Sequence, residues 1–199
     1  MRNRNVVTLA LATVLSVTVV ARQGTTKPVK TDVVHQNPKF IPVSEDALIA
    51  GSPFIIRGTV LNSREKDLVT PTDDKGGVAS LPRTTFAVRV SEVFKSDDPT
   101  ITTGSEIELL MLGGLRDRGD HVYALKVGGL EMPGVGDDVV LMLRKDTGGV
   151  FALATESGDS IITVRGNRIE SQAKSSGGRA MGQRSLSTLL QLLRQRGRR

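Results

Sequence analysis

The stretch that decides the fold is Val127-Gly-Gly-Leu-Glu-Met-Pro-Gly-Val-Gly-Asp-Asp-Val-Val-Leu-Met-Leu-Arg-Lys145. It begins as a glycine-rich loop and ends in Val139-Val-Leu-Met-Leu143, the most apolar run outside the N-terminus. Five apolar residues in succession, with charged residues at both ends, predict a central strand that is buried on both faces. The glycines precede a strand and no helix N-terminus, so they predict backbone bends rather than a phosphate-binding loop.

The composition limits both the core and the chemistry of the protein. A chain of 199 residues is long enough for one ordinary domain with tails. Aromatic residues make up only 3% of the chain and Trp is absent, so the core must be built from Val, Leu, Ile, Ala and a few Phe residues. The chain also has no Cys, which excludes disulfides, thiol catalysis and thiolate metal sites.

The net charge of +6 is unevenly distributed along the chain. Residues 1–30 and 171–199 together hold 12 of the 27 basic residues and no acidic residue. Residues 31–170 therefore hold the other 15 basic residues and all 21 acidic residues, a net charge of −6. A nucleic-acid-binding domain carries its basic patch on the folded body, so the acidic body argues against a nucleic-acid partner.

Residues 1–21 have the three-part layout of a secretory signal peptide. A short basic start precedes an apolar run from Val6 to Ala21, and the small residues Val19 and Ala21 suit cleavage after Ala21. An uncleaved anchor is the alternative, but about 16 residues fall short of the ~20 that a spanning helix needs. The pattern predicts an exported protein that is periplasmic, secreted or at the cell surface. Residues 22–43 are polar and rich in proline, and they predict a linker.

Residues 44–170 have the alternation of a mainly β domain. Phe54, Ile56 and Val60 fall on one face of a first strand, and Gly58 within it predicts a bulge or a bend. Further strand signals lie between turn residues, at 83–95, 107–111, 121–127, 139–143, 150–154, 161–165 and 168–170. Short strands with glycine bends predict a small closed or nearly closed barrel.

Two segments of this domain fall outside the strand pattern. Ser44 is a suitable N-cap for a short helix over residues 44–50, and Gly51 is expected to end that helix. The polar residues 62–82 predict a long excursion between two strands. Their acidic side chains do not have the spacing of a calcium loop and are expected to be solvated.

The C-terminal part consists of a Gly/Ser-rich linker over 171–184 and a basic amphipathic helix with its tail over 185–199. The helix has one apolar stripe, formed by Leu186, Leu189, Leu190 and Leu193. Two interpretations remain open: the stripe docks on the barrel, or the helix lies on an anionic membrane or partner. In the second case the contacts come from the arginines at its end, Arg194, Arg196, Arg198 and Arg199.

The order of the strands carries a resemblance to a known group of proteins. Ile56-Arg-Gly-Thr-Val60, Thr85-Phe-Ala-Val-Arg-Val-Ser-Glu-Val-Phe-Lys95 and Pro133-Gly-Val-Gly-Asp-Asp-Val-Val-Leu-Met-Leu143 follow one another in the chain. This run resembles uncharacterised exported bacterial proteins that have an OB-like barrel and are distantly similar to netrin and tissue-inhibitor-of-metalloproteinase modules. The resemblance covers about residues 46–170 and implies a small OB-like antiparallel barrel. Those eukaryotic modules depend on disulfides, so it carries no inhibitory role or functional residue over to this chain.

The residues offer no convincing catalytic constellation. A Gly-x-Ser-x-Gly elbow is absent, and the only histidines are His35, in the linker, and His121. His121 follows Asp120, so a hydrolytic enzyme that uses His121 with scattered carboxylates stays open as an alternative. Three adjacent carboxylate pairs are expected to face solvent, at Asp73 and Asp74, Asp97 and Asp98, and Asp137 and Asp138.

The preferred interpretation is an exported, non-catalytic binding or structural module of the cell envelope or the secreted fraction. Its partner is an unidentified envelope or extracellular ligand, and the chain is expected to be a monomer or a weak oligomer. No catalytic residue, metal ligand or cofactor is assigned. The alternatives are association with a polyanion or membrane surface through the C-terminal helix, and the hydrolytic enzyme. Arg57 and Arg89 are expected on the outer wall as solvated side chains.

Overall fold

The structure of the protein is a computed structural model that describes residues 30–36, 43–71, 78–117, 121–128, 130–146, 149–155, 158–171 and 176–197. Strands predominate in this part of the chain: β1 (Lys30–Gln36), β2 (Phe54–Pro71), β3 (Val78–Ser96), β4 (Glu106–Leu112), β5 (Gly114–Asp117), β6 (His121–Val127), β7 (Asp138–Lys145), β8 (Phe151–Leu153), β9 (Ile161–Arg165) and β10 (Arg168–Ser171). The helices are α1 (Glu45–Ala50), the short 3-10 helix η1 (Gly158–Ser160), α2 (Ser176–Gly182) and α3 (Leu186–Arg196).

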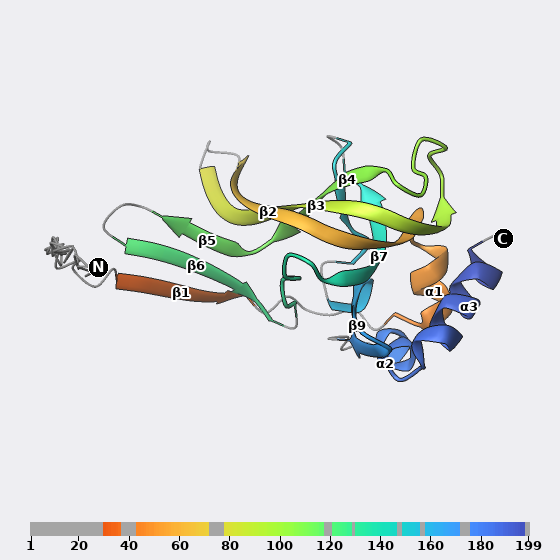
Figure 1. The fold of residues 1–199 in the computed structure, drawn as a ribbon. Helices are drawn as coiled ribbons and strands as arrows, with labels where there is room; N and C mark the ends of the chain where they lie inside the picture. Colours follow the sequence, from red (N-terminus) through yellow and green to blue (C-terminus); the bar gives the residue numbers. More distant parts are fainter. Residues whose placement is uncertain are drawn as a thin grey trace, which may run out of the picture.

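Five strands close into a barrel, in the order β7, β2, β3, β4, β8 and back to β7 (Figure 1). Four of the five pairings are antiparallel, and the pairing of β4 with β8 is parallel. β9 and β10 extend the sheet beyond β7. The prediction of a mainly β, OB-like barrel with a short N-terminal helix and a C-terminal amphipathic helix is confirmed.

The central strand β7 is buried on both faces, as its sequence predicts. All five residues from Val139 to Leu143 are fully buried. Val139, Leu141 and Leu143 belong to the core inside the barrel. Val140 and Met142 belong to a second core between the outside of the barrel and the helices. A strand between two cores must be apolar at every position, which explains the uninterrupted run.

The second core fixes α3 on the barrel. The apolar stripe Leu186, Leu189, Leu190 and Leu193 is buried there together with Met142 of β7. The hydroxyl of Ser185 accepts a hydrogen bond from the amide of Thr188 and caps the helix, and Gly197 ends it. Of the two interpretations of this stripe, docking on the barrel is the one that the structure adopts.

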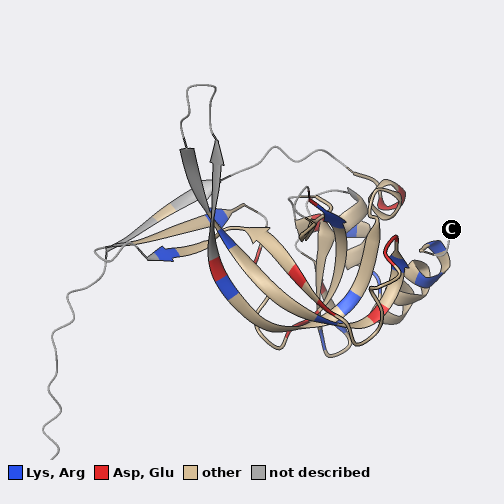
Figure 2. Cartoon of the chain, turned by 90° about the horizontal axis from the view of Figure 1, so that it is seen from above, with Lys and Arg blue, Asp and Glu red and all other residues tan. Residues whose placement is uncertain are grey.

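A second, three-stranded sheet projects from the barrel on the side opposite the helices (Figure 2). β6 is its central strand, paired in parallel with β1 and antiparallel with β5. The chain passes from barrel to sheet at Gly113 and Gly114, whose φ angles are +110° and +128°. Only glycine adopts such angles readily, so this corner depends on the glycine pair.

Three segments differ from the sequence-based prediction. β1 lies within the linker predicted over 22–43. The excursion predicted over 62–82 is largely a continuation of β2 and β3, which stay paired as far as Pro71 and Val78. α2 lies within the Gly/Ser-rich segment predicted as a linker over 171–184.

Long-range contacts explain these differences. β1 pairs with a strand that lies about ninety positions further along the chain, and local alternation carries no signal for such a pairing. α2 has three glycines, which disfavour a helix. It is nevertheless held closely, because Met181 is fully buried in the second core. A Cβ on Gly177 would lie only 2.4 Å from the amide nitrogen of Glu45.

Candidate functional site

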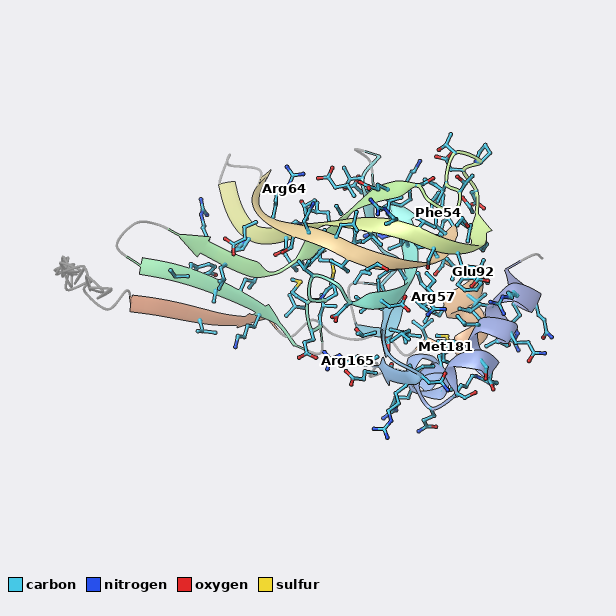
Figure 3. The ribbon with its side chains drawn as sticks, in the orientation of Figure 1. Phe54, Arg57, Arg64, Glu92, Arg165 and Met181 are labelled. Carbon is cyan, nitrogen blue, oxygen red and sulfur yellow. The ribbon has the colours of Figure 1, made fainter. Side chains whose placement is uncertain are left out.

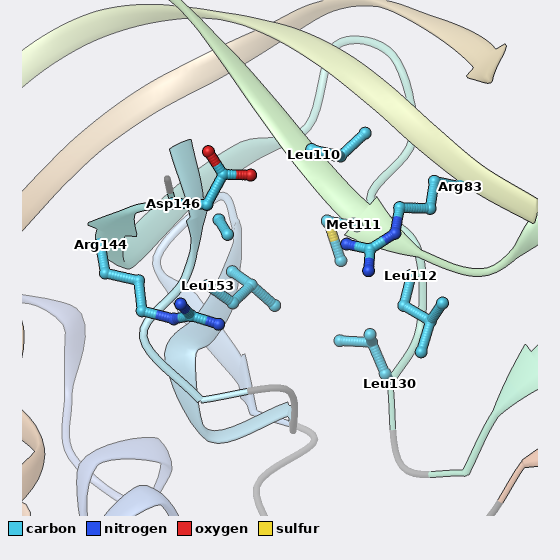
Figure 4. Close-up of a pocket in the computed structure, with 9 residues that line it drawn as sticks. Arg83, Leu110, Met111, Leu112, Leu130, Arg144, Asp146 and Leu153 are labelled. Atoms are coloured by element: carbon cyan, nitrogen blue, oxygen red, sulfur yellow. The ribbon is translucent and has the colours of Figure 1, made fainter. Parts of the chain in front are cut away.

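A pocket lies near the ends of β4, β7 and β8, where these strands meet the start of the barrel portion of β3 (Figure 4). Its volume is about 140 Å³. The apolar part of the lining is Leu110, Met111, Leu112, Leu130, Ala152 and Leu153, and the charged part is Arg83, Arg144 and Asp146. These residues come from four barrel strands, the segment before β7 and the turn after it, so the closed barrel is what brings them together.

One cross-strand row brings three of the lining residues together, namely Leu110, Ala152 and Arg144, and places Thr85 beside them. Thr85 of β3 pairs with Leu110 of β4, Leu110 pairs with Ala152 of β8, and Ala152 pairs with Arg144 of β7. Paired positions point to the same face of a sheet, so this row lies together on the outside of the barrel. Arg83 pairs with Leu112, one step along the same outer face. The guanidinium groups of Arg83 and Arg144 enter the pocket from opposite sides (Figure 4).

Neither Arg83 nor Arg144 has a hydrogen-bond or ion-pair partner within the described residues. The Nε atom of Arg83 is buried and has no partner in the described chain, and the same holds for the Thr85 hydroxyl in the adjacent row and for the Nε atom of Arg184 at the helix end. Other arginines of the described chain are neutralised by carboxylates: Arg57, Arg89, Arg165, Arg184, Arg194 and Arg196. A buried donor without a partner costs about 1–3 kcal/mol, so this arrangement is expensive unless something else accepts the hydrogen bond.

The charges of the lining favour a singly charged anion. Two arginines and one aspartate leave a net charge of +1 on the charged lining residues. Oδ1 of Asp146 accepts a hydrogen bond from the amide of Val150 at 3.2 Å, which holds this carboxylate within its turn. A guanidinium group matches a carboxylate or phosphate in shape and charge and binds it through two parallel hydrogen bonds.

The arginines predicted to contact a polyanion are engaged within the protein where the structure describes them. Nε of Arg194 donates to Oε1 of Glu92 at 2.6 Å, which raises the pKa of Arg194 through that hydrogen bond. Arg196 pairs with Asp46 and lies 3.5 Å from Oε1 of Glu45, both in α1. Arg198 and Arg199 lie outside the described residues.

The expectation that Arg57 and Asp138 are solvated side chains is wrong. Nε of Arg57 donates to both carboxylate oxygens of Asp138, at 3.1 and 3.0 Å, and this hydrogen bonding raises the pKa of Arg57. Both side chains are about three-quarters buried on the side of the barrel that faces α3, close to Glu92 (Figure 3). Arg89 is solvated as expected, since its side chain is 58% exposed in an ion pair with Glu106.

The remaining candidates for chemistry do not converge. His35 and His121 lie in β1 and β6, in the projecting sheet. Asp98 accepts hydrogen bonds from Lys145 and Thr100, which hold its pKa well below the usual range. Asp137 accepts from the amide of Gly134 at 2.8 Å and closes a turn. Asp73, Asp74 and Asp120 lie outside the described residues.

No group of three or more His, Cys, Asp or Glu residues in the described part of the chain is arranged to hold a metal ion. None of the helices that the structure describes has the length and apolar character needed to cross a membrane.

Sequence reasoning did not single out the pocket residues. One signal was present in β4, Glu106-Ile-Glu-Leu-Leu-Met-Leu112. Its outward positions are polar at Glu106 and Glu108 but apolar at Leu110 and Leu112, which marks an apolar patch on the outer wall. The unpaired state of Arg83 and Arg144 depends on which carboxylates the fold brings near, and that is not visible in the sequence.

Comparison with known proteins adds no relative. No protein-family model matches the chain, and no curated protein is significantly similar to it. The resemblance to exported OB-like proteins and to netrin-like modules stays a prediction.

Proposed function

We propose that the protein is an exported, non-catalytic binding module of the cell envelope or the secreted fraction, and that it binds a small anionic ligand in the pocket beside Arg83 and Arg144. One observation carries this proposal. Two guanidinium groups that have no partner among the described residues line the pocket beside its leucines: that of Arg83, whose Nε atom is buried, and that of Arg144, whose side chain is exposed. An anion in the pocket would supply the acceptor that Arg83 lacks and would be shielded from water by the leucines around it.

The position of the pocket on the barrel supports the same conclusion. OB-folds bind ligands on the face of their second and third strands, flanked by the loop between the first and second strands and the loop between the fourth and fifth. In this barrel the second and third strands are β3 and β4, and the turn between the fourth and fifth contains Asp146. This likeness of place is an analogy between folds, so the ligand is argued from the side chains alone.

Export is the part of the proposal that depends on residues 1–21. We expect the mature protein to begin at Arg22 and to be recovered outside the cytoplasm. Cell fractionation followed by N-terminal sequencing of the purified protein measures both. Recovery of the uncleaved chain in the cytoplasm would contradict export without bearing on the pocket.

Binding is tested with a small monoanion and a matched cation. We expect hexanoate to shift the backbone amide resonances of Leu110, Leu112 and Ala152 in ¹H–¹⁵N spectra, and hexylammonium to leave them in place. Arg83→Gln should weaken hexanoate binding about tenfold or more, because a hydrogen bond to a charged group contributes about 1.5–3 kcal/mol. Shifts confined to other faces, or none at millimolar hexanoate, would contradict the proposed site. Hydrolysis of ester or phosphoester substrates by the purified protein would contradict the non-catalytic assignment.

The two alternatives have less support. Association with anionic surfaces through the C-terminal helix must compete with the carboxylates that already pair with Arg194 and Arg196. An enzyme that uses His121 needs an acid or a nucleophile beside it, and that residue begins a strand of the projecting sheet. Salt-sensitive binding to anionic vesicles that is lost on removal of residues 185–199 would favour the first alternative.

A further inference from the structure

A largely apolar groove adjoins the pocket that contains Arg83 and Arg144. Its volume is about 460 Å³, and it runs along the projecting sheet beside β5, β6 and the segment after β6. Leu115, Leu125, Val127, Leu130 and Met132 provide most of its apolar lining. Leu115 is 50% exposed, although large apolar side chains are mostly buried in the described chain. A largely apolar groove of this volume has the size and character of a small-molecule site.

The groove and the pocket meet at Leu130, which lines both. Leu130 lies below Leu112 at the side of the pocket where the chain leads to β6 (Figure 4). The pocket alone is smaller than the 300–1,000 Å³ that small-molecule sites occupy, whereas the groove lies within that range. The charged pocket therefore adjoins the apolar groove. A ligand with a charged head and an apolar chain would fit the two together.

We infer that the ligand is a single-chain amphiphile with a carboxylate head, and that its head lies between Arg83 and Arg144 while its alkyl chain lies in the groove. This inference rests on the proposed function and specifies the ligand of that site. The net charge of +1 on the pocket lining matches a monoanion, and Asp146 would repel the second charge of a phosphate monoester. Lys126 and Glu131 are the charged residues of the groove lining, and the rest of the lining is apolar or glycine, which favours an alkyl chain over an oligosaccharide or a polar peptide.

The test separates the head from the chain by comparing three probes below their micellar concentrations: hexanoate, decanoate and decanol. We expect affinity measured by calorimetry to rise about fourfold for each methylene that enters the groove, the factor that corresponds to burial of one CH₂. Decanol, which has the chain without the charge, should bind at least tenfold more weakly than decanoate.

Two variants and one matched control test where the head and the chain of the ligand bind. Arg83→Gln should weaken hexanoate and decanoate by the same factor. Leu115→Ser should weaken decanoate about tenfold and leave hexanoate nearly unchanged, because a half-exposed leucine still buries apolar area on a longer chain. Arg89→Gln is the control for Arg83: it lies on the same outer face of β3, six positions away, and it is paired with Glu106. It should change neither affinity.

The outcomes distinguish this inference from the function on which it rests. Equal affinities for hexanoate and decanoate at the pocket would overturn the groove assignment and leave the anion site intact. Decanol as tight as decanoate would overturn the placement of the head between the arginines. A concentration-dependent dimer that Leu115→Ser dissociates would show that a second copy covers the groove. Failure of every carboxylate to reach the pocket would overturn both the inference and the proposed function.

Discussion

Two regions of this barrel differ in how their arginines are paired. The helix end is the part covered by α1 and α3, and the pocket face is the part of the outer wall beside β4 and β8. On the helix end, Arg184, Arg194 and Arg196 all find carboxylates in α1 or β3, and the leucine stripe of α3 is buried beneath them. On the pocket face, Arg83 and Arg144 have no partner within the described residues, and the leucines around them line an open space. The arginines of the helix end are therefore paired with carboxylates, although the Nε atom of Arg184 is buried without a partner among the described residues. Arg83 and Arg144 have no such carboxylate in the described chain, and we propose that an anion takes its place.

This difference shows why the number of basic residues in a segment does not indicate which of them can bind a ligand. The arginines that stand out in the sequence lie in the basic C-terminal segment, and those that the structure describes there are largely neutralised by the fold. The two arginines of the pocket are scattered in an acidic body and do not stand out at all. Availability of a charge depends on its neighbours in space, and the pairs here join residues such as Glu92 and Arg194 that are 102 positions apart.

The largest effect is expected at the helix end, where Leu189 is fully buried. Leu189→Ala removes three carbons from the second core and should lower the free energy of unfolding by about 2–5 kcal/mol, as core truncations do. Urea denaturation followed by circular dichroism measures this change. Gln191→Ala, on the exposed side of the same helix, is the control and should stay within about 0.5 kcal/mol of the parent. A small effect of Leu189→Ala would mean that α3 is not docked in solution.

The next effect comes from breaking a neutralised pair at that end. Arg184→Met leaves the carboxylate of Glu45, whose side chain is only 13% exposed, without its 3.0 Å partner. We expect a loss of about 1–3 kcal/mol, less than for a fully buried pair because Arg184 is itself a third exposed. Chemical denaturation measures it, and Glu45→Gln in the same background should recover part of the loss. Full stability of Arg184→Met would remove the distinction between paired and unpaired arginines.

The same substitution at the pocket should have the opposite sign. Arg83 and Arg184 both have a buried Nε atom without a partner among the described residues, but only Arg184 also pairs with a carboxylate. Arg83→Met therefore leaves no carboxylate unpaired there, and the free energy of unfolding should stay the same or rise by up to about 1 kcal/mol. Thermal and urea denaturation of the ligand-free protein measure this change. Destabilisation comparable to that of Arg184→Met would mean that Arg83 has a structural role, and the case for a missing anion would fail.

The smallest effect concerns two neighbours on β7, Lys145 and Arg144. The hydrogen bond from Lys145 holds the pKa of Asp98 well below its usual value, with help from Thr100. A carboxyl group with a lowered pKa contributes stability above its unfolded pKa of about 3.9, and that contribution is lost as the pH falls through the folded pKa. Lys145→Gln should therefore raise the pKa of Asp98 in a ¹³C carboxyl titration and reduce stability most near neutral pH. Arg144→Gln should leave this pKa unchanged, and an equal shift in both variants would contradict the separate roles of these cations.

The barrel could be predicted from the sequence because its strands have local patterns. Alternation at Phe54, Ile56 and Val60 and the apolar run at 139–143 are confirmed by the two cores. The bulge predicted at Gly58 is confirmed by a register shift, and a Cβ there would lie 2.6 Å from the carbonyl oxygen of Arg89. Each of these features arises from the residues of a single strand, which is the range over which periodicity is informative.

The site could not be predicted, for the same physical reason. Arg83 and Arg144 come to line one pocket only because β3, β4, β8 and β7 pair side by side in the folded barrel. β1 and α2 were likewise missed, because a distant strand and a buried Met181, respectively, hold them in place. The apolar outward positions Leu110 and Leu112 were the one local hint, since they interrupt the polar face of β4.

The most direct measurement is the ¹H–¹⁵N spectrum of the arginine Nε–H groups, recorded as decanoate is added. We expect the Arg83 resonance to move and to become protected from exchange with water as the buried Nε–H finds a carboxylate acceptor. The resonances of Arg57 and Arg194, which already donate to Asp138 and Glu92, should not change. A response at Arg194 with none at Arg83 would contradict the assignment of the pocket face as the anion site and would indicate that the anion binds at the helix end.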